Sequence, residues 1–209
     1  MIFDNNSIIK LRSLVKDRLS EKRYLHTIGV EKLAVHLATI LIPDKIDELS
    51  AAALLHDIAK ELSYDEHVQL VTESGIDYSE EDLIVKPALH SLAALPIIKA
   101  EFTEFATDNI LSAVANHTLG APDMSVFDEI VFISDYAEEG RTYRTCIEVR
   151  NYLLDNIRKE KSLVDNITAL HTASLRSVIS TIESLERRNE VINTRTLLTK
   201  SYLESIIRK

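Results

Sequence analysis

The feature that most restricts the fold of this chain is how rarely its sequence interrupts a helix. The 209 residues contain only four glycines and four prolines, and neither residue type occurs after Gly140. Glycine and proline are the strongest local signals for turns and helix ends, so long helical segments remain uninterrupted. Strand-like alternation of apolar and polar residues is hard to find. The sequence therefore predicts an all-α fold.

Hydrophobic spacing indicates where the first helices lie. Apolar residues at positions 8, 9, 11, 14, 15 and 19 recur three and four residues apart, as on one helix face. A second helix is expected from about Tyr24 to Pro43. A third opens at Ala51 and is apolar on most sides, which predicts a position in the middle of the bundle.

The remaining helices are indicated by capping boxes and by long segments without breaks. Ser63 and Ser125 each begin a capping box, before helices that end near Glu73 and Glu139. Further helices fit residues 87–100 and 103–117, and residues 145–209 fit two or three long helices without evident site chemistry.

Composition narrows the class of protein. With 45% apolar and 27% charged residues, the chain is typical of a globular protein, and we expect one domain over residues 1–209. A single cysteine, Cys146, and an acidic, polar start predict a cytoplasmic location. No apolar stretch reaches the length of a membrane span. The net charge of −9 argues against a nucleic-acid partner.

The adjacent pair His56-Asp57 on the apolar third helix is the first candidate for chemistry. Burying a histidine beside a carboxylate is costly unless something pairs with them, and a metal ion is one such partner. The alternative is structural, with His56 in a core hydrogen bond and Asp57 in a salt bridge to Lys60. Arg23 and His26 are also three residues apart, so each cation shares a helix face with a candidate ligand.

Further histidines and an aspartate extend this pair into a pattern along the chain. His26, His56-Asp57, His90, His117 and Asp135 follow one another in successive predicted helices. This order resembles the HD superfamily of metal-dependent phosphohydrolases. The segments 116–125 and 133–141 resemble those of the symmetrical diadenosine tetraphosphate hydrolases of the YqeK type. The likeness covers roughly residues 8–200 and implies an HD-domain helical bundle, with a metal-site core at about 20–145 and a helical extension at about 146–209.

The resemblance implies roles for particular residues. His26, His56, Asp57 and Asp135 would ligate a first divalent metal, iron by analogy or manganese, and His90 and His117 would complete a second metal site or contact phosphate. Catalytic roles are implied for Arg23, His56, Asp57 and Lys60. Substrate contacts are implied for Arg23, His26, Lys60, His90, His117, Thr118, Asp135, Arg141, Thr142 and Tyr143.

Each of these residues also has a simpler interpretation. Arg23 would be a solvated charge at a helix start, and His90 an exposed histidine in the first turns of its helix. Asp135 would only pair with Arg141, and His117 would terminate a helix. Of the other histidines, His36 is expected to be structural or exposed, and His67 and His171 are expected to be surface residues.

The resemblance predicts a hydrolase that cleaves diadenosine tetraphosphate symmetrically into two ADP by attack of a metal-bound water. The alternatives are an HD-type enzyme for another nucleotide (a monophosphatase, a deoxynucleoside triphosphatase or a cyclic-nucleotide phosphodiesterase) and a weakly catalytic nucleotide-binding module. The expected partner is a small-molecule nucleotide, with no nucleic acid and no membrane, and a homodimer is compatible with the sequence.

Overall fold

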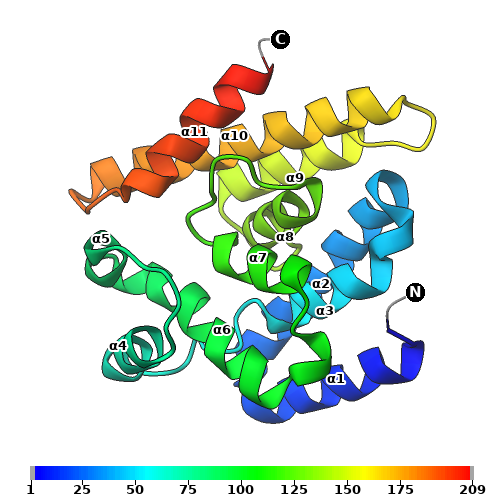
Figure 1. Ribbon diagram of the computed structural model, residues 1–209. Coiled ribbons are helices and arrows are strands. Elements are labelled where there is room, and N and C mark those ends of the chain that lie inside the picture. The colour runs from blue at the N-terminus through cyan, green and yellow to red at the C-terminus, as the bar shows by residue number, and fades with distance from the viewer. Residues whose placement is uncertain (1–2, 208–209) are drawn as a thin grey trace.

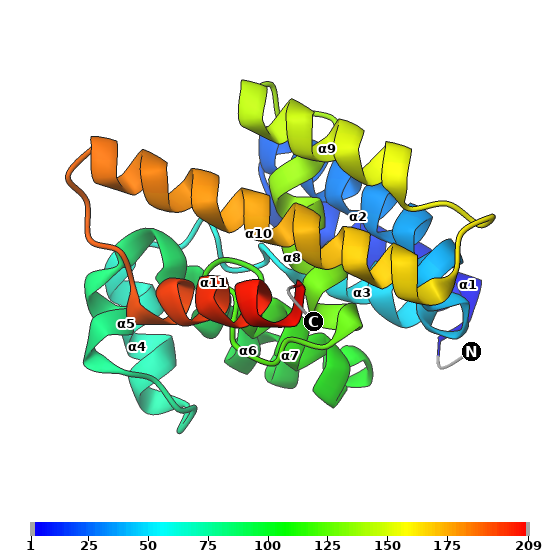
Figure 2. The same ribbon diagram turned by 90° about the horizontal axis from the view of Figure 1, so that it is seen from above.

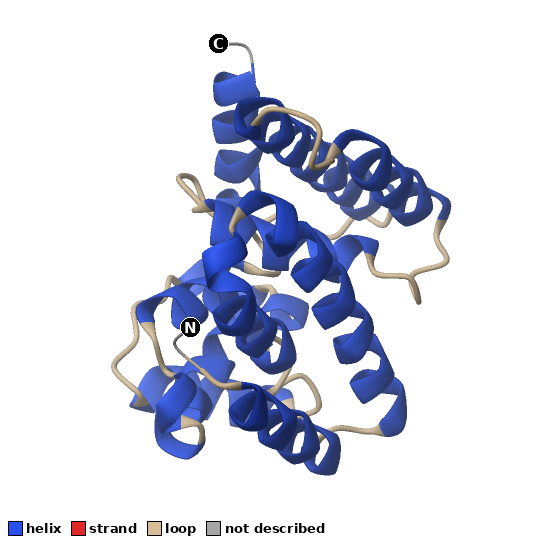
Figure 3. Ribbon diagram, turned by 90° about the vertical axis from the view of Figure 1, so that its right-hand side faces the viewer, coloured by secondary structure: helices blue, strands red, loops and turns tan. Residues whose placement is uncertain are grey.

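The structure is a computed structural model that describes residues 3–207, and within that range it contains eleven α-helices, three short 3-10 helices and no strand (Figure 3). The predicted all-α fold is confirmed. The α-helices are α1 (Asn5–Arg18), α2 (Glu21–Leu41), α3 (Ile46–Leu55), α4 (Tyr64–Glu73), α5 (Glu80–Ile84), α6 (Leu89–Glu101), α7 (Asp108–Asn116), α8 (Val126–Ala137), α9 (Arg144–Asn156), α10 (Leu163–Arg187) and α11 (Thr194–Ile207). The 3-10 helices are Pro43–Lys45, Lys86–Ala88 and Thr103–Phe105.

Local signals in the sequence locate the starts of two helices, α4 and α8. Both predicted capping boxes are present, with the Ser63 and Ser125 side chains accepting from backbone N–H groups at the starts of α4 and α8. A third capping box at Ser79 opens the five-residue helix α5, which the sequence analysis did not predict. A helix of barely more than one turn is too short for a hydrophobic period to reveal it.

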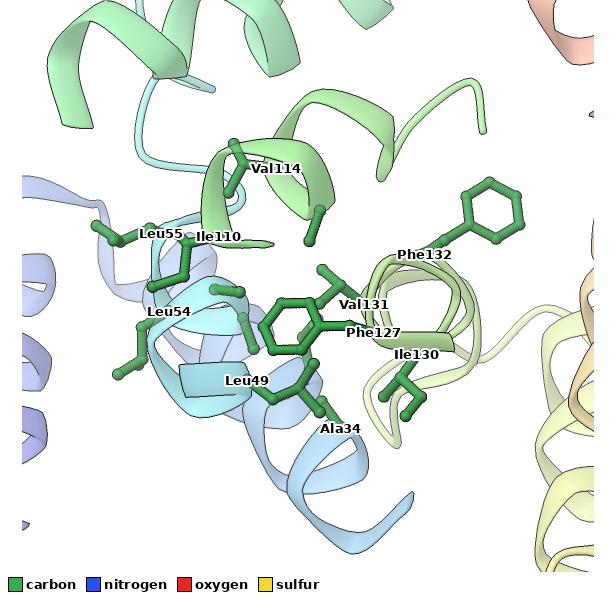
Figure 4. Packing of buried hydrophobic residues seen from close by; sticks show 14 of the residues in the cluster. Ala34, Leu49, Leu54, Leu55, Ile110, Val114, Phe127, Ile130, Val131 and Phe132 are labelled. Atoms are coloured by element: carbon green, nitrogen blue, oxygen red, sulfur yellow. The ribbon is translucent and has the colours of Figure 1, made fainter. Parts of the chain in front are cut away.

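Helix α3 lies at the centre of the core, as its uniformly apolar sequence predicts. Leu49, Leu54 and Leu55 are fully buried, and α3 packs against α1, α2, α7 and α8. Figure 4 shows side chains of α3, α7 and α8 meeting in this core. The helix begins at Ile46, five residues before the expected start. Its last turn delivers the His56-Asp57 pair into the interior of the bundle.

Two of the three C-terminal helices, α9 and α10, pack against α8, and α11 packs against α10. Helix α10 packs against α8, α9 and α11, and Figures 1 and 2 show α9 and α11 flanking it. Within residues 3–207, no helix has both the length and the apolar character that crossing a bilayer requires. The C-terminal helices therefore add a layer over the part of the fold that carries the histidines.

Helix α11 also fixes the loop that follows His117. Gly120 has φ +69°, and its N–H donates to Asn116 O at 2.9 Å, which ends α7. A Cβ at Gly120 would lie 2.6 Å from Cγ2 of Thr199 on α11. Only glycine fits both the left-handed backbone and this close approach.

Candidate metal centre and its cavity

Six histidine and aspartate side chains from separate parts of the fold meet at one interior point. Their side chains are at most 22% exposed. They are His26 on α2, His56 and Asp57 just after α3, His90 on α6, His117 at the end of α7 and Asp135 on α8.

The backbone around the His56-Asp57 pair differs from the expectation that it lies on a helix. Helix α3 ends at Leu55, and residues 56–60 form consecutive turns, with the Lys60 N–H donating to Asp57 O at 2.9 Å. The three-residue spacing of Asp57 and Lys60 is therefore not a helix face. Their side chains still approach, because Lys60 Nζ lies 3.8 Å from Asp57 Oδ1.

The Asp57 carboxylate stands between two sets of histidines. Its Oδ2 lies 3.7 Å from His26 Nε2 and 3.5 Å from His56 Nε2. Its Oδ1 lies 3.0 Å from His90 Nε2 and 3.6 Å from His117 Nε2. Each oxygen thus faces a different pair of imidazoles, which is the arrangement of a carboxylate able to bridge two ions.

Asp135 completes the set on the Oδ2 side. Its Oδ1 lies 2.9 Å from His26 Nε2 and 4.0 Å from His56 Nε2. Two groups of possible donor atoms each lie within 4.8 Å of one another: His26, His56 and Asp135, and His56, Asp57 and His117. Imidazole nitrogen and carboxylate oxygen suit divalent transition metals such as iron and manganese.

The imidazole rings are held by the nitrogen that points away from the cluster. Nδ1 of His56 lies 2.6 Å from Ala53 O, and Nδ1 of His117 lies 2.7 Å from Val114 O. A carbonyl oxygen only accepts, so Nδ1 carries a proton and Nε2 is the nitrogen that faces the cluster. His56 Nε2 is buried without a hydrogen-bond partner. A buried orphan nitrogen aimed at carboxylates fits a metal ligand.

The cluster strongly perturbs the pKa values of its members. Burial opposes protonation of His26, but hydrogen bonds to Asp135 and Glu138 outweigh it and raise the pKa of His26 to about 9. Burial and the nearby Lys60 charge lower the pKa of His90 to about 3. Burial alone would raise the pKa of Asp57, yet the surrounding histidines hold it well below its usual range. Binding of a charged ligand at the cluster would therefore change the protonation of these side chains.

Three cations border the cluster, and each already contacts one of its carboxylates. Arg23 Nη1 lies 2.6 Å from Asp57 Oδ2, and Arg141 Nη2 lies 2.7 Å from Asp135 Oδ1. Lys60 Nζ lies 3.1 Å from His90 Nε2, and burial lowers the pKa of Lys60. These positions place positive charge around the two carboxylates of the cluster.

A cavity of about 540 Å³ opens beside the cluster. Thr118 is at its inner edge, with Oγ1 3.0 Å from His117 Nε2, and Tyr143 is at its rim with 74% of its surface exposed. Thr142 is exposed and does not line the cavity. The lining residues are His117, Thr118, Phe132, Asp135, Tyr136, Arg141, Tyr143, Thr145, Cys146, Ser180, Thr181, Ser184, Arg187 and Arg188.

The simpler interpretations of the candidate residues have mixed outcomes. His90 is 1% exposed, so it is not a surface histidine, and Arg23 is ion-paired rather than only solvated. Asp135 does pair with Arg141, and His117 does end α7, but both also belong to the cluster.

The predictions for the histidines outside the cluster are correct for one and wrong for two. His36 is exposed as expected. His67 is buried, because Nε2 lies 2.8 Å from Ala59 O across the turn after α3. His171 is half-buried, with Nδ1 2.7 Å from the buried Glu129 carboxylate.

Glu138, the residue after α8, belongs to the site although it was not predicted from the sequence. Its Oε1 lies 3.1 Å from His26 Nδ1, and it is 3% exposed. Gly29 allows this approach, since a Cβ there would lie 2.4 Å from Glu138 Oε2. The sequence signal was the three-residue spacing from Asp135, which puts both carboxylates at the same end of α8. Glu138 therefore orients the His26 ring through Nδ1, the nitrogen on the side away from the cluster.

Residues 145–209, where no site chemistry was expected, contribute to the lining of this cavity. Thr145 and Cys146 on α9, four residues of α10 and Arg188, which directly follows α10, line the cavity. The sequence shows that α10 has a polar face. It does not show which part of the protein that face meets.

Comparison with known proteins places this cluster in a family. The HD domain model matches residues 23–140, more than half of the chain. The chain belongs to the HD domain family. This HD domain protein is 31% identical, over 93% of its length and 95% of the relative, to a protein of Halalkalibacterium halodurans named bis(5'-nucleosyl)-tetraphosphatase, symmetrical. A protein of Bacillus subtilis with the same name is 29% identical over 91% of this chain and 94% of that one.

A solved structure agrees with the sequence comparisons. It is a protein of Clostridium acetobutylicum described as a predicted HD superfamily hydrolase involved in NAD metabolism, 30% identical, with a TM-score of 0.79 over 96% of this chain and 97% of that one. The likeness covers both the cluster and the helices beyond it. The six clustered side chains all lie within the matched residues 23–140, whereas α9, α10 and α11 lie outside them.

Proposed function

We propose that this HD domain protein hydrolyses diadenosine tetraphosphate at its central bridge to give two molecules of ADP. The observation that carries the proposal is the Asp57 carboxylate, whose two oxygens face separate imidazole pairs beside a cavity of nucleotide size. The proposal is supported by the printed names of the two bacterial relatives that match more than nine-tenths of the chain.

The proposed metal ligands follow from the donor atoms. His26, His56, Asp57 and Asp135 would hold one divalent ion, and His90 and His117 would hold a second together with Asp57. Iron or manganese suits this set of nitrogen and oxygen donors. A divalent ion bound there supplies Lewis acidity, which lowers the pKa of water and neutralises phosphoryl charge.

The chain's own residues bind and orient the substrate. Arg141 offers a planar fork that can leave Asp135 and grip phosphate oxygens in two-point fashion. Lys60 and Arg23 add point charges on the other side of Asp57. Phosphoryl transfer needs mainly positioning and charge stabilisation, so no side-chain nucleophile is required.

The position of the cut depends on which phosphate is anchored beside the cluster. A site that grips a whole nucleoside diphosphate presents the central bridge, whereas one that grips a monophosphate presents the bridge next to it. Thr118 and Arg141 line the cavity at its inner edge, and Tyr143 lies at the rim. The cavity therefore has room beyond its inner edge, which supports anchoring of the diphosphate and so a symmetrical cut.

The decisive experiment is to incubate iron-loaded or manganese-loaded protein with diadenosine tetraphosphate in ¹⁸O-labelled water and to separate the products. The expected result is ADP alone, with label on the terminal phosphate of one of the two ADP molecules formed in each turnover. His36→Ala is the control variant, because His36 is exposed on α2 far from the cluster. Formation of AMP and ATP would contradict the symmetrical cut, and hydrolysis only of other nucleotides would contradict the substrate.

A further inference from the structure

The cavity beside the cluster has a second wall, which comes from α10. Ser180, Thr181, Ser184 and Arg187 of α10 line it, together with Arg188, which caps the end of the helix. Counted from Ser180, the other four lie one, four, seven and eight residues further along the chain. This spacing puts all five on the same side of the helix. Within the described residues that line this cavity, the positive side chains other than histidine are Arg141 near the cluster and this arginine pair on α10.

The arginine pair Arg187 and Arg188 stands out because the protein as a whole is strongly acidic. The chain carries a net charge of −9, and the cations nearest the cluster already contact Asp57 or Asp135. Arg187 lies 3.9 Å from Glu183, and Arg188 lies 3.2 Å from Glu190, and all four side chains are largely exposed. Ion pairs this exposed are weak, so both guanidiniums can be transferred to an anionic ligand.

Resting on the proposed function, we propose that this face of α10 binds one nucleoside diphosphate half of the dinucleotide. The Arg187 and Arg188 guanidiniums take phosphate oxygens, and the hydroxyls of α10 take the sugar. A cavity of about 540 Å³ is within the size range of small-molecule sites. The half that occupies it extends from Thr118 and Arg141 at the cluster to α10.

The position of α10 relative to the residues that match the HD domain model indicates the role of this wall. Helix α10 lies outside residues 23–140, the part that matches the HD domain model, whereas the whole His/Asp cluster lies inside it. The cluster would carry out the hydrolysis, and α10 would select what is hydrolysed. Contacts made equally in the bound substrate and in the transition state change KM without changing kcat.

The test compares two arginine variants with a matched control. The double variant R187Q/R188Q removes both charges from the cavity. The control R144Q removes an arginine that is also exposed and paired with a glutamate, Glu148 at 2.7 Å, but does not line the cavity. ADP binding is measured by calorimetry with and without metal, KM and kcat are measured with diadenosine tetraphosphate, and circular dichroism checks folding.

The expected result is a rise in the Kd for ADP and in KM of about twentyfold in R187Q/R188Q, at about fivefold for each exposed charge contact. The kcat should stay within about twofold, and R144Q should match the parent protein. Equal ADP affinity in the double variant and in R144Q would overturn the proposed wall. If R187Q/R188Q weakens ADP binding but the parent makes AMP and ATP, the wall stands and the symmetrical function fails.

Discussion

Replacing Gly29 by alanine should weaken metal binding while leaving the protein folded. Gly29 lies in α2, three residues after His26, and an alanine Cβ there would lie 2.4 Å from Glu138 Oε2 and 3.1 Å from Glu138 Cδ. Carbon and oxygen do not approach this closely, so the Glu138 carboxylate must move. Moving it breaks the 3.1 Å contact with His26 Nδ1 and the hydrogen bond from the Gly140 N–H.

The magnitude follows from two opposing contributions to stability. Alanine is more favourable than glycine inside a helix by about 1 kcal/mol. Loss of hydrogen bonds to the buried Glu138 carboxylate costs about 1–3 kcal/mol. The free energy of unfolding should therefore fall by at most about 2 kcal/mol, which a typical domain survives. Metal affinity should fall by about 10-fold to 100-fold, since His26 loses the group that orients it.

A double-mutant cycle with Glu138→Ala isolates this mechanism. If Gly29→Ala acts by displacing the carboxylate, it should cause no further loss of metal affinity in the Glu138→Ala background. There it should raise the free energy of unfolding by about 1 kcal/mol, because only the helix preference remains. Metal affinity is read from chelator competition and stability from urea unfolding. Parental metal affinity in folded Gly29→Ala, or an equal loss in both backgrounds, would refute the reasoning.

Three further predictions concern the proposed roles of single residues. Asp57→Ala should abolish activity and reduce bound metal, measured by elemental analysis, whereas His36→Ala should do neither, and near-normal turnover with full metal in the Asp57 variant would exclude the assignment. Arg141→Ala should raise KM and lower kcat at unchanged metal content, because guanidinium binds phosphate but not a cation, and parental kinetics would place Arg141 outside the site. Since the pKa of His26 is raised from 6.5 to about 9, metal-free protein should be stabilised by about 3 kcal/mol below pH 6.5 and lose this as the pH rises through 9. Urea unfolding across this range tests it, with His26→Gln as the variant expected to lack the slope.

The sequence by itself determined the helical fold and the family. Few glycines and prolines and clear capping boxes are local properties, and they act within about one turn of the residues concerned. The uniformly apolar α3 predicted its own central position, because a helix without a polar face must be buried. The order of His26, His56-Asp57, His90, His117 and Asp135 indicated the HD superfamily, and the comparisons confirm that family.

Only the tertiary structure decided how these residues face one another. The sequence predicted His56-Asp57 on a helix, but α3 stops at Leu55, and the following turns aim the two Asp57 oxygens at different histidine pairs. Contacts such as Glu138 to His26 join positions more than a hundred residues apart. Such contacts depend on how helices pack, which no local pattern encodes.

The same reason explains why the cavity wall from α10 was missed. A row of hydroxyl and arginine side chains on one helix face looks like any solvated surface when read along the chain. The packing of α10 against α8 and α9 turns that face toward the His/Asp cluster. Sequence fixes which side chains share a helix face, whereas burial and packing between distant helices fix what that face meets.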